Sequence, residues 1–264
     1  MSENTDLFLE ERRRAILERI REAGRISVNE LSEMFGVSPV TIRTDLNILA
    51  EEKLIIRTHG GAVPFIPLPR EISLAYRMQR QTAEKAKIGK KAAELIGDGD
   101  SIFVDSSSTA LAMVKHLRDR TGLTLITNGI AAASELTDTR EINIVMPGGR
   151  FRHEMASLVG VDGLEILKAY NISKGFFGAY GISLEAGLTD ISPEEAQIKK
   201  AILSMCREVI CVLDATKWEK VGAASFATLE QIDHIITCAD PEHVSSRFIT
   251  EIINKGIKVT LLEI

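Results

Sequence analysis

The 264-residue sequence predicts an α/β protein in which a small, mainly helical domain precedes a larger domain with a mainly parallel sheet. Three observations predict this class. Residues 10–49 carry apolar side chains at helical spacing, with glycines at the expected turns. Three of the seven prolines follow closely, at Pro64, Pro67 and Pro69. Beyond them, short apolar runs alternate with helical stretches, which is typical of a parallel sheet covered on both faces.

The composition is that of an ordinary globular protein, with 45% hydrophobic residues, 26% charged residues and a net charge of −5. No apolar run approaches the roughly 18 residues that a membrane helix needs, and the acidic N-terminus lacks a signal-peptide pattern. We therefore expect a cytoplasmic protein without a membrane partner. The three cysteines form no Cys-x-x-Cys pair, so we expect free thiols and neither a metal site nor a cofactor. They are Cys206, Cys211 and Cys238.

Two helices are expected before residue 36. The first covers residues 10–23 and ends near Gly24. Its apolar side chains share one face: Ile16, Leu17 and Ile20. The second begins at Ser27, which has the Ser-x-x-Glu spacing of a capping box with Glu30, and Leu31 and Phe35 lie on one of its faces. Gly36 then allows a tight turn into a third helix, so the pattern is that of a helix-turn-helix.

The third helix has a well-specified start, because Ser38 can cap it and proline suits its first turn. Apolar side chains at i, i+4 and i+7 form its buried stripe: Ile42, Leu46 and Leu49. The other faces then present hydrogen-bonding side chains that suit a DNA groove: Thr41, Arg43, Thr44 and Asn47. A strand over residues 55–57 and the sequence His59-Gly60-Gly61, which can take positive φ at a ribbon tip, predict a wing.

Charge gives this interpretation no broad support. Residues 1–60 carry nine Arg or Lys against eleven Asp or Glu, so any contact with DNA has to be local. One small basic cluster is expected at Arg12, Arg13 and Arg14, although these can equally be a solvated helix start. A second is expected across the third helix and the wing, at Arg43, Arg57 and His59. A helical packing unit without a nucleic-acid partner remains the alternative.

Residues 13–62 resemble the signature of the deoxyribonucleoside-repressor (DeoR) family of bacterial regulators. That signature commonly reads Val-Ser-x-x-Thr-Ile-Arg-Arg-Asp-Leu, followed by Arg-x-His-Gly-Gly-Ala, and this chain departs from it only at Thr44. The resemblance implies a transcriptional regulator that binds a double-stranded DNA operator as a homodimer or homotetramer. The implied DNA-binding residues are Ser38, Thr41, Arg43, Thr44, Asn47, Arg57 and His59. We expect a winged helix-turn-helix domain at residues 1–63, a proline-rich linker at 64–70 and a second domain at 71–264.

The second domain should begin with a mostly helical segment over residues 71–96, followed by a turn. Seven apolar runs are then candidate strands: residues 101–104, 123–126, 142–146, 175–179, 209–213, 234–237 and 257–262. Ligands of open α/β sheets bind at the carboxyl ends of the strands. The residues there include Asp105 and a hydroxyl cluster at 106–109 that runs into a helix over 110–117, a natural phosphate cradle. Asn128, the pair Gly148-Gly149 and Lys217 follow later strands.

This domain resembles the sensor domain of the same family, which is similar to ribose-5-phosphate isomerase and glucosamine-6-phosphate deaminase. The resemblance implies a phosphorylated-sugar effector and matches Ser106, Ser108 and Thr109 to a phosphate loop. It also matches Asn128, Gly148, Gly149 and Lys217 to the following turns, and Glu195 and Lys199 to a Glu-Ala-x-x-x-Lys pattern. Ser107 stands where the family usually carries Gly, so a positive φ there would strain the loop.

The expected function is repression of a sugar or carbohydrate operon under control of that effector. The alternative is a phosphosugar isomerase with an accessory DNA-binding domain. Isomerisation needs a carboxylate base, and the turn Gly178-Ala179-Tyr180-Gly181, which matches the isomerases' acidic turn, contains none. Glu185 and Asp190 lie nearby in the sequence. We therefore expect a regulator and not an enzyme, while a second domain that only oligomerises is a third possibility.

Overall fold

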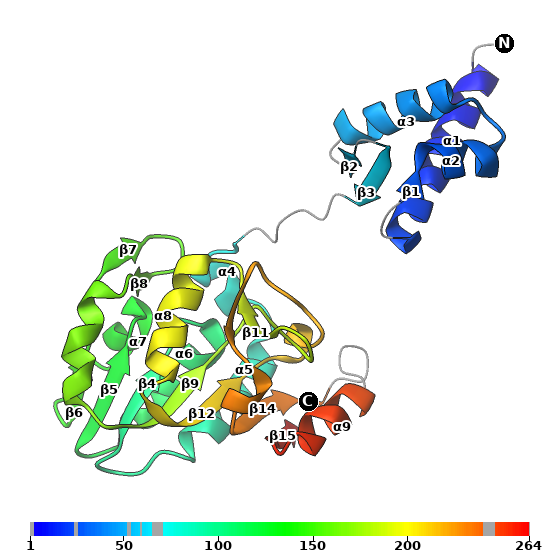
Figure 1. The fold of residues 1–264 in the computed structure, drawn as a ribbon. Helices are drawn as coiled ribbons and strands as arrows, with labels where there is room; N and C mark the ends of the chain where they lie inside the picture. The colour runs from blue at the N-terminus through cyan, green and yellow to red at the C-terminus, as the bar shows by residue number, and fades with distance from the viewer. Residues whose placement is uncertain are drawn as a thin grey trace. The chain divides into compact units, whose positions relative to one another are not determined.

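A computed structural model describes residues 3–23, 26–51, 54–58, 60–64, 71–239 and 246–263. The chain divides into two compact units, residues 1–68 and 69–264 (Figure 1). No helix among the described residues is long and apolar enough to cross a membrane.

The first unit is a winged helix-turn-helix. Its elements are α1 (Glu3–Ala23), β1 (Ile26–Ser27), α2 (Val28–Phe35), α3 (Pro39–Glu51), β2 (Ile55–Thr58) and β3 (Gly61–Pro64). The strands form an antiparallel sheet in the order β1-β3-β2. A separate hydrophobic core holds the unit together, and it includes the predicted stripes of all three helices. This unit therefore buries its own apolar side chains without help from the rest of the chain.

The local signals at α2 act as the sequence predicts. The Ser27 hydroxyl accepts from the Glu30 amide at 3.2 Å, and the Glu30 carboxylate accepts from the Ser27 amide at 2.7 Å, which is a complete capping box. Gly36 ends α2 in the left-handed region, at φ 64°. At α3, the Ser38 hydroxyl accepts from the Thr41 amide at 3.2 Å. Gly24 lies outside the described residues.

Two details of this unit differ from the prediction. α1 begins at Glu3, seven residues earlier than expected. The glycines of the wing do not take positive φ, because Gly60 and Gly61 both lie in ordinary regions. Gly61 is instead needed for close approach, since a Cβ there would collide with the Ile26 carbonyl of β1. His59 lies outside the described residues.

The second unit is an α/β domain around seven parallel strands, in the order β15-β14-β12-β9-β4-β5-β6. These strands are β4 (Ser101–Val104), β5 (Leu123–Thr127), β6 (Ile142–Val145), β9 (Ile172–Phe177), β12 (Cys206–Val212), β14 (His234–Cys238) and β15 (Lys258–Leu262). They are the seven predicted strands, with ends shifted by up to three residues. The prediction of a mainly parallel sheet is confirmed.

Helices cover both faces of this sheet (Figure 1). The α-helices are α4 (Leu74–Met78), α5 (Thr82–Ala93), α6 (Ser108–Val114), α7 (Ile130–Glu135), α8 (Pro193–Leu203) and α9 (Ser246–Asn254). Short 3-10 helices are η1 (Lys115–Leu117), η2 (Asp162–Ala169), η3 (Ala215–Lys217) and η4 (Leu229–Gln231). The helical segment expected over residues 71–96 is thus two helices, because Gln81 takes a left-handed conformation at φ 48° and interrupts it.

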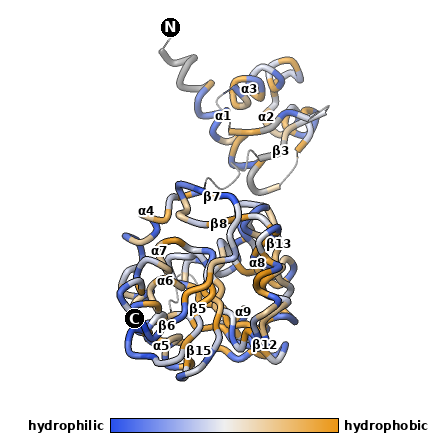
Figure 2. Tube along the Cα trace, turned by 90° about the vertical axis from the view of Figure 1, so that its left-hand side faces the viewer, coloured by the Kyte–Doolittle hydropathy of each residue, from blue (hydrophilic) through white to orange (hydrophobic). Residues whose placement is uncertain are grey.

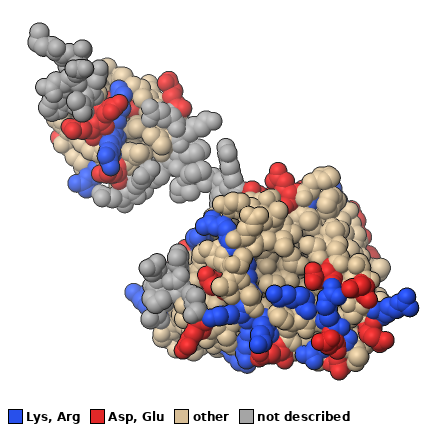
Figure 3. All heavy atoms as spheres, turned by 180° about the vertical axis from the view of Figure 1, so that it is seen from behind, with Lys and Arg blue, Asp and Glu red and all other residues tan. Residues whose placement is uncertain are grey.

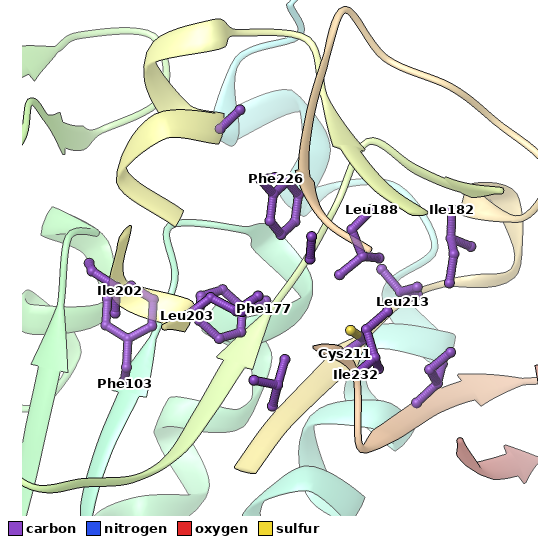
Figure 4. Close-up of a cluster of buried hydrophobic side chains, with 14 of the residues drawn as sticks. Phe103, Phe177, Ile182, Leu188, Ile202, Leu203, Cys211, Leu213, Phe226 and Ile232 are labelled. Carbon is purple, nitrogen blue, oxygen red and sulfur yellow. The ribbon is translucent and has the colours of Figure 1, made fainter. Parts of the chain in front are cut away.

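Two hydrophobic clusters sandwich the sheet. Ile102 and Val104 of β4 pack on one side with α5, α6 and α7, whereas Phe103 packs on the other side with α8 and α9. Figure 4 shows Phe103 and Phe177 beside Ile202 and Leu203 of α8 in the second cluster. Figure 2 shows that strands such as β5 and β12 are largely hydrophobic. A strand buried on both faces needs this composition.

Five short antiparallel strands decorate the domain and were not predicted. They are β7 (Arg150–Arg152), β8 (Ser157–Val159), β10 (Gly181–Ser183), β11 (Gly187–Asp190) and β13 (Ala224–Ala227). β7 pairs with β8, and β11 lies between β10 and β13.

The strand order reverses between β4 and β9. From β4 the chain proceeds outward through β5 and β6, whereas from β9 it proceeds the opposite way through β12, β14 and β15. The loops after β4 and β9 therefore leave the sheet in opposite directions and open a crevice between them. This is the switch point at which open α/β sheets bind ligands.

Candidate functional site

A pocket of about 530 Å³ opens at this switch point. Its walls come from the loops after β4, β9 and β12, from the start of α8 and from the segment 71–85. Most of the lining is polar or charged, and it includes Glu71, Arg77, Arg80, Lys85, Ser106, Ser107, Ser108, Thr109, Gly178, Tyr180, Asp190, Glu195, Lys199, Asp214, Lys217 and Lys220. Six of the sequence-predicted effector residues thus line one cavity: Ser106, Ser108, Thr109, Glu195, Lys199 and Lys217.

Asp105 lies behind the pocket and joins the two loops of the switch point. One carboxylate oxygen accepts from the Ser107 amide at 3.0 Å, and the other accepts from the Gly178 amide at 2.9 Å. Asp105 has no exposed surface. Its role in the fold is therefore to hold the loop after β4 against the loop after β9.

The strain expected at Ser107 is absent. Ser107 has φ −75° and ψ 148°, and its hydroxyl caps α6 by accepting from the Ala110 amide at 3.1 Å. The space for its side chain comes from the neighbouring loop, because a Cβ at Gly178 would collide with the Ser107 side chain. A serine is accommodated in the loop because position 178 is a glycine.

Lys199 is enclosed by acceptors. Its ammonium lies 2.9 Å from the carboxylates of Asp105 and Asp190 and 2.9 Å from the Gly178 carbonyl. Burial by itself lowers the pKa of Lys199, but the carboxylates of Asp105, Asp190 and Glu195 outweigh burial and the net pKa is raised. Lys199 stays charged, and its three hydrogen bonds are already used within the protein.

Glu195 is the buried carboxylate at the start of α8, and it connects the pocket to β7 and β8. It accepts from the Ser157 hydroxyl at 2.5 Å and from Arg152 at 3.3 Å, and the Ser106 hydroxyl lies 3.5 Å away. Arg152 in turn makes a two-bond ion pair with Glu71. Burial raises the pKa of Glu195, although Lys199 and the Ser157 hydrogen bond act against it.

Several cationic side chains also line the pocket. Burial lowers the pKa of Lys217, and Lys220 and Arg77 act in the same direction, while the Asp214 carboxylate acts against it. No hydrogen bond or ion pair to the Lys217 ammonium is found among the described residues. Lys85 donates to the Arg77 and Arg80 carbonyls at 2.6 and 2.7 Å, and burial lowers its pKa to about 8. An unpaired, partly desolvated ammonium is suited to bind an anion.

Besides Asp105, three of the predicted effector residues do not line this pocket. Asn128 follows β5 and Gly148-Gly149 follows β6, and these strands lie one and two places away from the switch point. The side-chain amide of Asn128 donates to the Leu158 carbonyl at 3.2 Å, and the backbone carbonyl of Asn128 accepts from the Leu158 amide at 2.8 Å. Asn128 therefore holds β8 in place. Gly148 and Gly149 take φ 79° and 115° in a turn beside β8.

Sequence reasoning missed much of the cationic lining and a residue behind it. Arg77, Arg80 and Lys85 line the pocket and come from the helical segment before the first strand. Arg152, which contacts the lining residue Glu195, comes from a short antiparallel strand. The rule used for prediction inspects only residues that follow parallel strands, so it passes over all four. A Lys within a charged helix carries no visible signal, because most such residues are solvated.

In the first unit, α3 presents an exposed face. Arg43, Thr44 and Asn47 are exposed, and Ser38 and Thr41 form a hydroxyl pair at 2.9 Å at the start of the helix. Arg57 of the wing donates to the Arg43 carbonyl and to the Asn47 side chain, each at 3.1 Å. Arg57 therefore fixes the wing against α3, which the sequence did not predict.

The expected basic cluster at residues 12–14 is not a free basic surface. Arg12 and Arg13 lie 2.7 and 3.1 Å from the carboxylate of Asp45, which is 1% exposed in α3. Arg14 alone is well exposed. Two of the three arginines thus join α1 to α3.

On the larger unit, Figure 3 shows Lys and Arg interspersed with Asp and Glu on the visible face, so that face carries no broad basic surface.

The described residues contain no cluster of three His, Cys, Asp or Glu side chains able to hold a metal ion. Cys211 and Cys238 are buried and Cys206 is half-buried, all as free thiols. Burial raises the pKa of Cys206 to about 12 and that of Cys238 to about 11. These thiols are therefore protonated at neutral pH and unreactive.

Two family profiles match the chain, one for each unit. The DeoR-like helix-turn-helix domain matches residues 12–65, and the DeoR C-terminal sensor domain matches residues 80–238. The chain belongs to the DeoR family. It is a DNA-binding transcriptional regulator, as its sequence predicts.

Similar proteins in this family are regulators and repressors. The HTH-type transcriptional regulator GolR of Listeria innocua is 35% identical over 88% of this chain and 91% of its own. The HTH-type transcriptional repressor GlcR of Bacillus subtilis is 36% identical over 88% and 89%. The glycerol-3-phosphate regulon repressor of Escherichia coli is 32% identical over 88% and 91%. All three relatives of the DeoR-family chain are named as transcriptional regulators or repressors.

Among solved structures, ribose 5-phosphate isomerase A of Methanocaldococcus jannaschii matches with a TM-score of 0.38 and 20% identity. The match covers 51% of this chain and 53% of that one. This similarity is too low to transfer an activity to the DeoR-family chain.

Proposed function

We propose that this DeoR-family regulator represses a sugar or carbohydrate operon and releases its operator when a phosphorylated sugar binds the pocket of the second unit. The observation that carries the proposal is the distribution of charge in the pocket. Lys217 has the cations Lys220 and Arg77 near it, with Asp214 as the main opposing charge, whereas Glu195 and Asp190 lie around Lys199. A sugar phosphate has a dianionic end and a polyhydroxyl end, so its two ends match these two groups of residues.

The phosphate end would be held by Lys217 and by the hydroxyls of Ser108 and Thr109. These two residues begin α6, whose first amides have no partner within the helix, and the Ser107 hydroxyl caps only the Ala110 amide. An ammonium, two hydroxyls and free amides together complement phosphate oxygens. Asp105 and Lys199 have their hydrogen-bonding capacity used within the protein, so we assign them the role of positioning these loops.

The sugar end would be recognised by Glu195 and Ser106. A buried carboxylate accepts hydrogen bonds from hydroxyl groups at fixed positions, and such bonds discriminate strongly between analogues that have or lack a hydroxyl. The name of one relative, the glycerol-3-phosphate regulon repressor of Escherichia coli, also supports a phosphorylated polyol or sugar as the effector.

The operator would be bound by α3 in the major groove, with the wing alongside. Ser38 and Thr41 suit phosphate contacts at the start of the helix, while Arg43 and Asn47 suit base edges, and His59 belongs to the same proposal. Reading a two-fold operator requires two copies of α3 about 34 Å or a multiple apart, so we propose a homodimer or homotetramer. Its DNA partner implies a cytoplasmic location.

Coupling between the two functions would pass through residues 71–80. This segment follows the proline-rich connection of residues 64–70 directly and forms one wall of the pocket. It is held to β7 and its following turn by the Glu71–Arg152 ion pair and by the Leu74 amide, which donates to the Glu154 carbonyl at 2.9 Å. Arg152 also contacts Glu195. A ligand that hydrogen-bonds to Glu195 would therefore change the position of Arg152, which holds the segment through Glu71.

Thermal-shift screening of sugar phosphates against their unphosphorylated sugars tests the effector assignment. A ligand at 100 times its dissociation constant should add about 2.7 kcal/mol to the free energy of unfolding. Lys217→Ala should weaken the best ligand about 10- to 100-fold, since it removes a charged hydrogen bond to phosphate. Lys168→Ala, on exposed η2, is the matched control and should bind normally. Equal stabilisation of wild type and Lys217→Ala would remove Lys217 from the site.

A further inference from the structure

Val40 is an exposed apolar residue on the DNA-reading helix, and no feature of the fold accounts for it. Its side chain is 67% exposed, and no large hydrophobic side chain among the described residues is more exposed. It stands in the first turn of α3, opposite the buried stripe of Ile42, Leu46 and Leu49. An isolated exposed valine is unremarkable on most surfaces, but this one lies on a face with a defined purpose.

Val40 shares that face with Arg43, Thr44 and Asn47. The spacing is i, i+3, i+4 and i+7, which places four side chains on one side of a helix. The three polar members are recognisable in the sequence as candidates for DNA contact, whereas Val40 is not, because apolar residues in a helix normally belong to the core.

Thr44 adds apolar surface to Val40. Its hydroxyl donates to the Val40 carbonyl at 3.1 Å, so its only hydrogen-bond donor is used by the helix backbone. What remains for a partner is a methyl group and an acceptor oxygen. Thr44 is also the one position at which this chain departs from the family signature, where an arginine is usual. Next to Val40, this chain therefore presents a methyl group and an acceptor oxygen where the family signature has a cation.

Two polar side chains of the face suit base edges. The Asn47 side-chain carbonyl accepts from Arg57 at 3.1 Å, which uses one of its two lone pairs and holds this side chain beside the wing. Arg43 suits the two-bond recognition of guanine.

We propose that Val40 and Thr44 together read the 5-methyl group of a thymine in the operator, one per half-site, and so are specificity-determining residues. This inference rests on the proposed operator contact of α3. The thymine methyl is the only apolar group on a base edge in the major groove, and it is what small apolar side chains recognise there. The base that Val40 and Thr44 contact in each half-site is therefore a thymine.

The experiment begins with the full-length protein and a random duplex library, from which bound duplexes are selected and sequenced. Each thymine of the selected half-site is then replaced singly by deoxyuridine, which removes only the methyl group. We expect one replacement to weaken binding about three- to fivefold, the value of burying one methyl group. Val40→Ala and Thr44→Ser should each bind more weakly and lose most of this thymine preference.

Two variants separate methyl reading from DNA binding in general. Arg43→Ala should bind more weakly yet keep the thymine preference, because it acts on another base pair. Met34→Ala changes an exposed apolar residue of α2 and should behave as wild type. The proposal is overturned if no deoxyuridine replacement weakens wild type, or if Val40→Ala keeps the full preference. Selection that enriches no duplex would overturn both this inference and the operator contact.

Discussion

Ser107 and Gly178 occupy one shared space between the loops after β4 and β9. A side chain at either position is compatible with the fold only while the other position leaves room, because the built Cβ of residue 178 collides with Ser107. The hydroxyl of Ser107 also caps α6. Two residues 71 positions apart in the chain are therefore coupled by volume and not by charge.

Gly178→Ala should destabilise the protein by about 1–3 kcal/mol, the usual cost of overpacking. Ser107→Gly should cost only a few tenths of a kcal/mol, because glycine is an acceptable N-cap. The double variant should be more stable than Gly178→Ala alone, since the collision is relieved. Urea unfolding of all four proteins measures this, and strictly additive free energies would contradict the shared space.

Lys85 should make effector binding depend on pH. Burial lowers its pKa to about 8, so above pH 8 most molecules of the empty protein carry it neutral. A bound dianion favours the ammonium and raises that pKa again. Binding should therefore take up a proton between about pH 8 and 10, and affinity should fall as pH rises through 8.

Calorimetry at pH 8.5 in two buffers of different ionisation enthalpy detects this proton. Lys85→Arg, which stays charged, should bind with the same heat in both buffers. Identical heats for the wild type would show that Lys85 does not respond to the ligand.

At the scale of elements, Asp45 joins two helices of the winged unit. Its carboxylate is buried in α3 and paired with Arg12 and Arg13 of α1. Asp45→Asn should destabilise this unit by about 1–3 kcal/mol, because two charge-assisted hydrogen bonds are lost while the arginines can still reach water. Hydrogen exchange of the α3 amides should become correspondingly faster. Arg14→Ala, which removes an exposed pair with Glu18, should change exchange little.

The elements that could be predicted are those whose sequence is a mainly apolar run. The inner strands β4 and β5 are buried along most of their length, and the edge strands β6 and β15 are partly exposed but still mainly apolar. β7 and β10 have three residues each, and a sequence such as Arg150–Arg152 has no periodicity to detect. Such strands form because the loops around them are already fixed, which is tertiary information.

The residues of the candidate site also fall into those that the sequence predicts and those that it does not. Ser106, Ser108, Thr109 and Lys217 follow parallel strands, so the sequence marks each of them as a candidate, and the strand order places them at or beside the switch point. Asn128 also follows a strand, but β5 lies on the far side of β4, and strand order cannot be read from the sequence. The partnership of Glu195 with Arg152 depends on β7 folding back over α8, which no local pattern records.

At the scale of the whole molecule, residues 71–80 connect the pocket to the chain that leads to the DNA-binding unit. Glu71→Gln should loosen the hold of Arg152 on this segment without touching α3. Operator affinity in the absence of effector should stay within about twofold, whereas the effector-induced change should shrink from the usual 5- to 150-fold toward one. Glu165→Gln, in an exposed pair on η2, is the control. An unchanged effector response would exclude this route.

The winged unit has its own hydrophobic core and lies first in the chain, whereas the pocket needs strands from across the second unit. At about 5–20 residues per second, a ribosome spends roughly 10 to 40 s on residues 69–264 after completing the first unit. During that time, the first unit has all the residues of its own core, while the pocket still lacks strands. A chain that stalls in translation, or loses its second unit to proteolysis, would keep the winged unit but lack the pocket, so no ligand of that pocket could act on it.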